Sequence, residues 1–199
     1  MIVEFVGLPG CGKTTYLEKL HQRSTDIIDR KKLDKSRIST LSYMKFIFNN
    51  KSLFFVFGIG VLYNFEINLK RWLTLLLGVH YTFIQYAKIF EIKNQNNIVL
   101  DEGLLQRSLS VFYFNHRKLN PYLFKKVIKI ISDSRYIDHI VFFNIEPILS
   151  IERCKKRGSG LPYRYKKFDA KTLKLKFCNA INGIEYIKKS SLIKFEQVN

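Results

Sequence analysis

The chain begins MIVEFVGLPGCGKTTYLEKL at residues 1–20, and this stretch decides the fold. An apolar run of mostly β-favouring residues, 2–6, breaks into GLPGCGKT at 7–14, and a helical pattern follows over 13–23. The octet fits G-x-x-x-x-G-K-[ST], the motif of a phosphate-binding loop, and it has the strand before it and the helix after it that this motif requires. The alternative interpretation is a glycine-rich turn that binds nothing.

A loop of this kind binds phosphate through its backbone. Successive N–H groups point into one concavity, and the positive end of the following helix attracts an anion. The glycines permit positive φ and close approach of the backbone to phosphate oxygens. We expect Lys13 to reach the β- and γ-phosphates of ATP and the Thr14 hydroxyl to be a ligand of Mg²⁺. The predicted nucleotide-binding residues are Gly7, Pro9, Gly10, Cys11, Gly12, Lys13, Thr14 and Thr15.

Length and charge limit what the rest of the chain can be. A chain of 199 residues predicts one domain over 1–199, with a helical insertion at about 40–94. The 34 Lys and Arg exceed the 16 Asp and Glu, giving a net charge of +18. This surplus favours phosphate-rich ligands, nucleic acid or an anionic membrane face as partners. A Lys-, Ile-, Asn- and Phe-rich composition inherited from an AT-rich genome explains the same surplus without any partner.

The cysteines and the N-terminus predict the compartment. Cys11, Cys154 and Cys178 are odd in number and widely spaced, so they indicate neither a disulfide framework nor a zinc pattern. The first residues form a predicted core strand, so we do not expect them to act as a signal peptide. We expect a cytoplasmic protein, with peripheral contact at the inner membrane face as an open alternative. The oligomeric state is left open.

The order of elements predicts the fold class. Short apolar strands are expected at 2–6, 26–28, 97–101, 139–145 and 192–196. Helices are expected at 13–23, in several pieces across 40–94, and at 103–117, 120–134, 147–157 and 169–189. Strands that alternate with helices in this way predict a three-layer α/β/α domain with a parallel sheet and right-handed crossovers.

The segment 40–90 is unusually apolar. It contains SLFFVFGIGVLYNF at 52–65 and WLTLLLGVHYTFIQYA at 72–87, each free of Asp, Glu, Lys and Arg, with Lys70 and Arg71 between them. Each run is shorter than the about 18–20 residues of a spanning helix. We expect core helices that cover the sheet and line a substrate cleft. The alternatives are a surface that meets a membrane or a lipid-linked substrate, and two membrane-spanning helices.

Ligands of parallel sheets bind outside the carboxyl ends of the strands, so the residues that end each strand are candidates. The second strand is followed by Asp29 and Arg30, and the third by Asp101 and Glu102, with Arg107 five residues further on. An acid at the end of a buried strand is the usual second half of a nucleotide site, where it holds Mg²⁺ directly or through water. The alternative for Asp101 is a helix N-cap, and for Asp29 a solvated loop charge.

The strand-end residues also define a predicted acceptor site. The candidates for binding an acceptor are Asp29, Arg30, Glu102 and Arg107. The residues alone do not choose a general base among Asp29, Asp101 and Glu102.

A basic segment follows the fourth strand. From Arg153 to Lys176 there are ten Lys or Arg against one acid, Asp169, and this excess marks residues 153–168 as a lid. Arg153 and Arg157 are four residues apart and share one face if a helix runs through both. A mobile loop with arginines neutralises charge on a transferring phosphoryl group and expels water when it closes. The alternative is a solvated basic face.

Three motifs together carry a resemblance. GLPGCGKTT at 7–15, VLDEG at 99–103 and IERCKKRG at 151–158 are similar to those of the P-loop nucleoside and nucleotide kinases, of which thymidylate kinases and deoxynucleoside kinases are the nearest well-known members. The resemblance implies the P-loop NTPase fold with strand order 2-3-1-4-5, and an acceptor between the 40–90 region and the strand tips. It also implies phosphate binding by Lys13, Mg²⁺ at Thr14, and lid contacts from Arg153 and Arg157.

One departure from these families bears on the acceptor. Thymidylate kinases end the third strand with Asp-Arg and deoxynucleoside kinases with Glu-Arg, where this chain has Asp101-Glu102-Gly103. The apolar middle region is more extensive than a nucleoside pocket requires. An acceptor from glycan or lipid-linked biosynthesis suits such a region as well as a nucleoside or nucleotide does.

Together these features predict an ATP-dependent kinase that phosphorylates a hydroxyl or phosphate of a small molecule, with Lys13, Asp29, Asp101, Glu102, Arg153 and Arg157 as its catalytic candidates. A second hypothesis is a polynucleotide 5′-kinase or another P-loop protein that acts on nucleic acid. Its support is that Tyr163, Tyr165 and Phe168 lie among lysines. The aromatic rings could stack on bases while the lysines contact the nucleic-acid backbone. A third hypothesis is a regulatory NTPase without an acceptor.

Overall fold

The computed structural model describes residues 1–24, 26–63, 69–92, 97–113, 121–157 and 168–198. A five-stranded parallel sheet has the order β2-β3-β1-β4-β5, as predicted. Its strands are β1 (Ile2–Gly7), β2 (Ile27–Asp29), β3 (Asn97–Leu100), β4 (His139–Phe143) and β5 (Lys194–Val198). All six residues of β1 are buried, because this strand has a neighbour on each side and helices on both faces.

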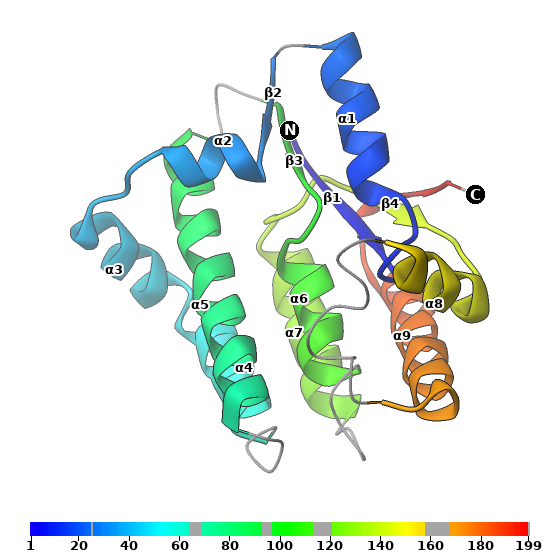
Figure 1. Cartoon of the computed structure of the whole chain (residues 1–199). Coiled ribbons are helices and arrows are strands. Elements are labelled where there is room, and N and C mark those ends of the chain that lie inside the picture. Colours follow the sequence, from blue (N-terminus) through cyan, green and yellow to red (C-terminus); the bar gives the residue numbers. More distant parts are fainter. Residues whose placement is uncertain (25, 64–68, 93–96, 114–120, 158–167, 199) are drawn as a thin grey trace.

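The helices of the described residues alternate with these strands (Figure 1). They are α1 (Lys13–Arg23), α2 (Arg30–Lys35), α3 (Thr40–Asn49), α4 (Lys51–Tyr63), α5 (Leu69–Ile92), α6 (Leu104–Phe112), α7 (Pro121–Asp133), α8 (Pro147–Lys156) and α9 (Ala170–Ser190). Helix α1 contacts β1 from one face of the sheet, where Phe5, Leu17 and Phe143 pack together, whereas α6 and α9 contact β1 from the other face. This is the expected three-layer α/β/α arrangement.

Several predicted boundaries were wrong by one or two residues. The third strand ends at Leu100 rather than 101, and the fourth ends at Phe143 rather than 145. The second and fifth strands lie at 27–29 and 194–198 instead of 26–28 and 192–196. Both strands therefore end later in the sequence than predicted. Their last residues still pair with the neighbouring strand, Asp29 with Val99 and Val198 with Phe143. Helix α2 was not predicted at all.

The insertion forms three helices, α3, α4 and α5, at the left of Figure 1. Their inner residues, among them Phe46, Phe57 and Phe83, belong to the same hydrophobic core as the sheet. A Cβ atom at Gly60 would lie 2.6 Å from Val111 Cγ1, so α4 packs with its backbone close to α6. The inner faces of these helices are therefore core, as the first interpretation of this region expects.

The apolar helices of the insertion differ from membrane-spanning helices in length or composition. Within the described ranges, no single helix combines the length and the apolar composition needed to cross a bilayer. Helices α3 and α4 meet both criteria only when they are taken together, and the pair is bent by 87° at the break between them.

Candidate functional site

The phosphate-binding loop joins β1 to α1. Gly10 and Gly12 have φ of 82° and 100°, the left-handed region that side chains disfavour, and this explains why glycine occupies both positions. Gly12 is the residue before α1, so the helix begins directly at Lys13 and directs its first N–H groups at the loop. Thr14 and Thr15 are exposed in the first turn of α1. The backbone therefore has the geometry of an anion site.

Lys13 lies over this loop. Its Nζ donates hydrogen bonds to the carbonyl oxygens of Gly7 at 2.9 Å and Leu8 at 3.4 Å. Two side chains from elsewhere fix the loop from beneath. Gln106 Oε1 accepts from the Gly7 amide at 3.0 Å, and the Ser150 hydroxyl donates to the Pro9 carbonyl. The loop is thus held by α6 and α8 as well as by its own glycines.

Asp101 follows β3, the strand next to β1 in the sheet. Its Oδ1 is buried and has no hydrogen-bond partner, and the nearest cation is Arg30 Nη1 at 3.9 Å. Mg²⁺ usually keeps several waters and takes one or two protein oxygens together with substrate phosphates. A carboxylate oxygen without a hydrogen bond and the exposed hydroxyl of Thr14 are donors of this type. Within the described part of the chain, no group of three or more His, Cys, Asp or Glu is arranged to hold a metal.

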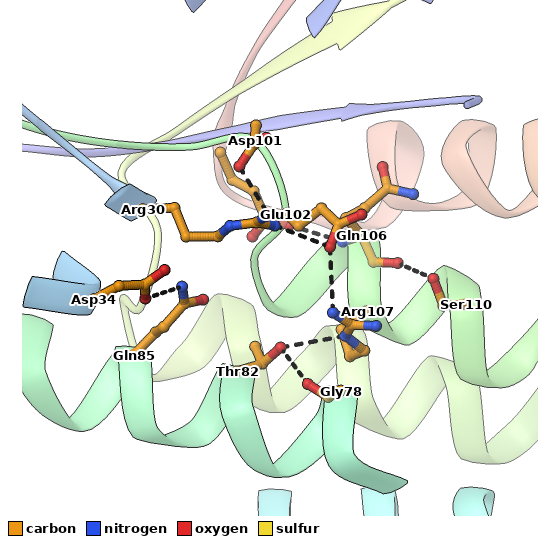
Figure 2. A network of polar contacts seen from close by, with 11 residues as sticks. Arg30, Asp34, Gly78, Thr82, Gln85, Asp101, Glu102, Gln106, Arg107 and Ser110 are labelled. Carbon is orange, nitrogen blue, oxygen red and sulfur yellow. Dashed lines mark hydrogen bonds and ion pairs between the residues drawn. The ribbon is translucent and has the colours of Figure 1, made fainter. Parts of the chain in front are cut away.

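Glu102 joins two arginines at the strand tips. Its Oε2 accepts from Arg30 Nη1 at 3.2 Å and from Arg107 Nη2 at 3.3 Å (Figure 2). Arg30 begins α2 and reaches across to both acids after β3. Burial alone would lower the pKa of Arg30, but Asp101 and Glu102 oppose this and raise it above its usual value. The predicted acceptor residues Arg30, Glu102 and Arg107 therefore form one cluster.

Helix α5 is shaped to receive Arg107. Thr82 Oγ1 accepts from Arg107 Nε at 3.2 Å and donates to the Gly78 carbonyl (Figure 2). A Cβ atom at Gly78 would lie 2.7 Å from Arg107 Nη1, so the missing side chain makes room for the guanidinium group. The apolar insertion thus supplies one wall of the acid–arginine cluster, where the sequence predicted an acceptor.

Asp29 lies apart from this cluster. Its Oδ1 accepts from the Lys32 amide at 2.8 Å and caps α2, and its Oδ2 lies 3.1 Å from His21 Nε2. Burial raises the pKa of Asp29, but these hydrogen bonds outweigh burial and lower it. The contacts are those of a helix cap that orients α2 and hence Arg30. A direct role for Asp29 in binding or activating an acceptor stays a prediction.

The predicted lid divides at the end of α8. Arg153 lines a cavity of about 730 Å³ beside the phosphate loop, together with Cys11, Gly12, Thr15, Tyr16 and Glu146. The condition for Arg153 and Arg157 to share one helical face is not met, because α8 ends at Lys156 and Arg157 has an extended backbone. The glycines at 158 and 160 in the sequence disfavour a longer helix. Residues 158–167 of the predicted lid, including Tyr163 and Tyr165, lie outside the described residues.

Comparison with solved structures places this geometry in a known fold. Three structures of deoxyadenosine kinase from M. mycoides match the whole chain and 90% of their own length, at 13–14% identity. Their TM-scores are 0.57 for the complex with dCMP and a flexible dCDP, 0.54 with dATP and 0.55 with dCTP. The chain has the fold of a P-loop deoxynucleoside kinase. No protein-family model and no curated protein matches its sequence.

Within this deoxynucleoside kinase fold, Glu4 is a residue that supports the site and was not among the predicted site residues. This residue lies in the middle of β1 and is completely buried. Its Oε2 accepts from the Leu105 amide at 3.2 Å and from the Tyr86 hydroxyl, and its Oε1 accepts from the Gln106 amide at 2.7 Å. Glu4 therefore caps the N-terminus of α6, the helix that carries Gln106 and Arg107. The sequence feature that could have identified Glu4 is that it is a single acid inside an otherwise apolar strand.

The stability of this kinase fold is expected to depend on Glu4 and pH. Burial raises the pKa of Glu4 from 4.5 to about 7, against opposing hydrogen bonds from Gln106, Leu105 and Tyr86. The folded state then binds the proton more tightly than the unfolded chain does. The contribution of this proton binding to the free energy of unfolding is complete below pH about 4.5. It is lost as pH rises through about 7, a change of about 3 kcal/mol. Urea unfolding between pH 5 and 8 measures this loss.

The control for this prediction is Glu4→Gln, which cannot titrate. We expect its free energy of unfolding to vary less with pH than that of the wild type, by about 3 kcal/mol across the same range. Parallel curves for the two proteins would show that Glu4 does not carry the pH dependence.

Proposed function

We propose that the chain is an ATP-dependent kinase that transfers the γ-phosphoryl group to a small-molecule acceptor. The observation that carries this proposal is that a phosphate-binding loop and an acid–arginine cluster lie at neighbouring strand tips. The phosphate loop with Lys13 follows β1, and the cluster of Asp101, Glu102, Arg30 and Arg107 lies at the tips of β3 and β2. One group suits the nucleotide triphosphate and the other an acceptor.

The residues have separate tasks in this proposal. Lys13 and the loop amides hold the β- and γ-phosphates, and Arg153 neutralises charge from the side of the cavity beside the loop. Thr14 and Asp101 would hold Mg²⁺, which would neutralise phosphate charge when bound. Glu102 holds two guanidinium groups, so it orients the acceptor's polar groups through them rather than removing a proton itself.

Two arginines at the acceptor side favour an acceptor that carries negative charge. Arg107 is largely buried and the Arg30 side chain is 36% exposed, so an acceptor phosphate or carboxylate can bind between them in place of part of the Glu102 contact. The M. mycoides structures are of a deoxyadenosine kinase with bound deoxynucleotides, which makes nucleosides and nucleotides the first candidates. Sugar phosphates and lipid-linked glycan intermediates are the second group.

The test is an acceptor screen with ATP and Mg²⁺, read by ADP release and by product mass. The screen contains nucleosides, nucleoside monophosphates, sugar phosphates and a 5′-hydroxyl oligonucleotide. A small molecule that gains one phosphoryl group supports the proposal. Phosphorylation of the oligonucleotide alone would favour the polynucleotide kinase hypothesis, and ADP release without any phosphorylated product would favour a regulatory NTPase.

Arg153 gives a further prediction. It is exposed and lines the cavity beside the phosphate loop, and a Cβ atom at Gly10 would lie 3.5 Å from its Cβ, so it is placed to act on the transferring group. We expect Arg153→Gln to lower kcat by about tenfold with a modest change in the KM for ATP. Lys155→Gln, on the same helix and not part of the cavity lining, is the matched control and should behave as wild type. An effect on KM alone would show that Arg153 serves only binding.

A further inference from the structure

The outer side of the insertion carries an apolar face that the proposed reaction does not use. Helix α3 exposes Leu41, Met44 and Phe48 at intervals of three and four residues, and α4 exposes Phe55 and Leu62, which are seven residues or about two turns apart. Phe48 is 75% exposed and Phe55 66% exposed. We call these five residues the outer apolar face. Such a face on two consecutive helices is larger than the scattered apolar residues of an ordinary surface.

The two helices present this face together. Phe48 from α3 and Phe55 from α4 line one hollow of about 480 Å³ at the bend between the helices, with Ile47, Lys51, Ser52 and Phe54. The opposite side of α4 is fixed to the protein, since Leu53 and Phe57 are fully buried and Gly60 packs against α6. Only one side of α4 is therefore available to a partner. A membrane could contact α4 along this side, but α4 could not cross it.

The charges around the outer apolar face identify the partner. Helices α3 and α4 contain no Asp or Glu, and their charged residues are Lys45 and Lys51, both exposed. Lys51 Nζ lies 5.9 Å from the centroid of the Phe48 ring, so a cation stands directly beside the apolar hollow. Apolar side chains with flanking lysines match the boundary between acyl chains and anionic head groups. The net charge of +18 adds a long-range attraction to the same surface.

We propose that the outer apolar face docks the protein peripherally on an anionic lipid membrane. Phe48, Phe55 and their neighbours enter the acyl-chain boundary, and Lys45 and Lys51 contact the head groups. This inference concerns binding to lipid and does not depend on the phosphoryl-transfer activity.

The experiment is flotation with vesicles of phosphatidylcholine alone and with about a third phosphatidylserine, at low and high salt. We expect the wild type to float only with the anionic vesicles and to be released by salt, because the lysine contacts are screened. The double variant Phe48→Gln/Phe55→Gln should bind about tenfold more weakly. Lys45→Gln or Lys51→Gln should each weaken binding by about fivefold. The matched control is Leu175→Gln/Leu192→Gln, which removes two exposed apolar residues outside the insertion and should leave binding unchanged.

Circular dichroism and thermal unfolding establish that each variant is folded before its binding is compared. Absence of flotation with anionic vesicles would overturn the proposal, as would equal binding by the Phe48/Phe55 variant. Wild-type protein that detergent alone releases, and salt does not, would show insertion rather than docking. A dimer in light scattering that disappears in the Phe48/Phe55 variant, without lipid binding by the wild type, would assign the face to a second copy of the chain.

Discussion

Lys13→Ala is expected to lower phosphoryl transfer by about 10²–10³-fold, the usual loss when one preorganised charge is removed from a transition state. The Lys13 ammonium group lies 2.9 Å from the Gly7 carbonyl, at the mouth of the loop whose amides point inward. Without it, negative charge on the β- and γ-phosphates is neutralised only by the backbone, the metal and Arg153. The loss should appear in kcat/KM for whichever acceptor the screen identifies.

Stability should change little in this variant. The polar contacts of the Lys13 side chain are with loop carbonyls and Cys11, and the loop remains held by Gln106 and Ser150. Thermal unfolding within a few degrees of the wild type would confirm that the chemistry alone was lost. Lys126→Ala on α7, which removes an exposed cation from a helix outside the site, is the control for net charge. Wild-type turnover in Lys13→Ala would refute the kinase proposal.

Asp101 and Glu102 are adjacent in sequence but should respond differently to neutralisation. Asp101 has a buried oxygen without a hydrogen-bond donor, so we assign it to the metal. Asp101→Asn should lower activity by about 10²-fold or more, and added Mg²⁺ should restore part of it. Glu102 already binds two guanidinium groups. Glu102→Gln should therefore cost about tenfold, through misplaced arginines, and should not respond to Mg²⁺.

The measurement is kcat and KM for ATP and acceptor across a Mg²⁺ titration. A loss of 10²–10⁴-fold in Glu102→Gln, with nucleotide binding intact, would instead identify Glu102 as a general base. Asp29→Asn serves as a comparison, because Asp29 caps α2 and should affect stability more than turnover. Full activity in Glu102→Gln together with collapse in folded Asp29→Asn would move the acid–base role to the second strand.

The parts of the site that the sequence predicted are local in the chain. The phosphate loop depends on glycines within a few residues of Lys13, and the strand order was expected from the resemblance to P-loop kinases. Asp101, Glu102 and Arg107 could be placed because a buried strand ends just before them. These features need only short-range patterns and the general rule that ligands bind at the carboxyl ends of parallel strands.

The parts that could not be predicted depend on partners distant in sequence. Glu4 meets the amides of Leu105 and Gln106, a hundred positions away, and nothing near Glu4 announces a helix N-terminus. Asp29 Oδ1 accepts from an amide of α2, a helix too short to give an apolar pattern, and Oδ2 contacts His21 on α1. A four-residue spacing places two side chains on one face only if both residues are helical. Helix α8 ends at Lys156, so this condition does not hold for Arg153 and Arg157.

The burial of Glu4 beneath α6 has a consequence for how this site can evolve. A Cβ atom at Gly103 would lie 2.5 Å from Glu4 Oε2, so position 103 admits a side chain only when position 4 holds something smaller. The two positions should therefore be inherited as a pair and change together in an alignment of homologues. A lineage that replaces Glu4 by a small residue becomes free to replace Gly103, whereas one that keeps Glu4 retains the glycine at position 103. The covariation of these two positions would then sort such sequences into two groups before any acceptor is known.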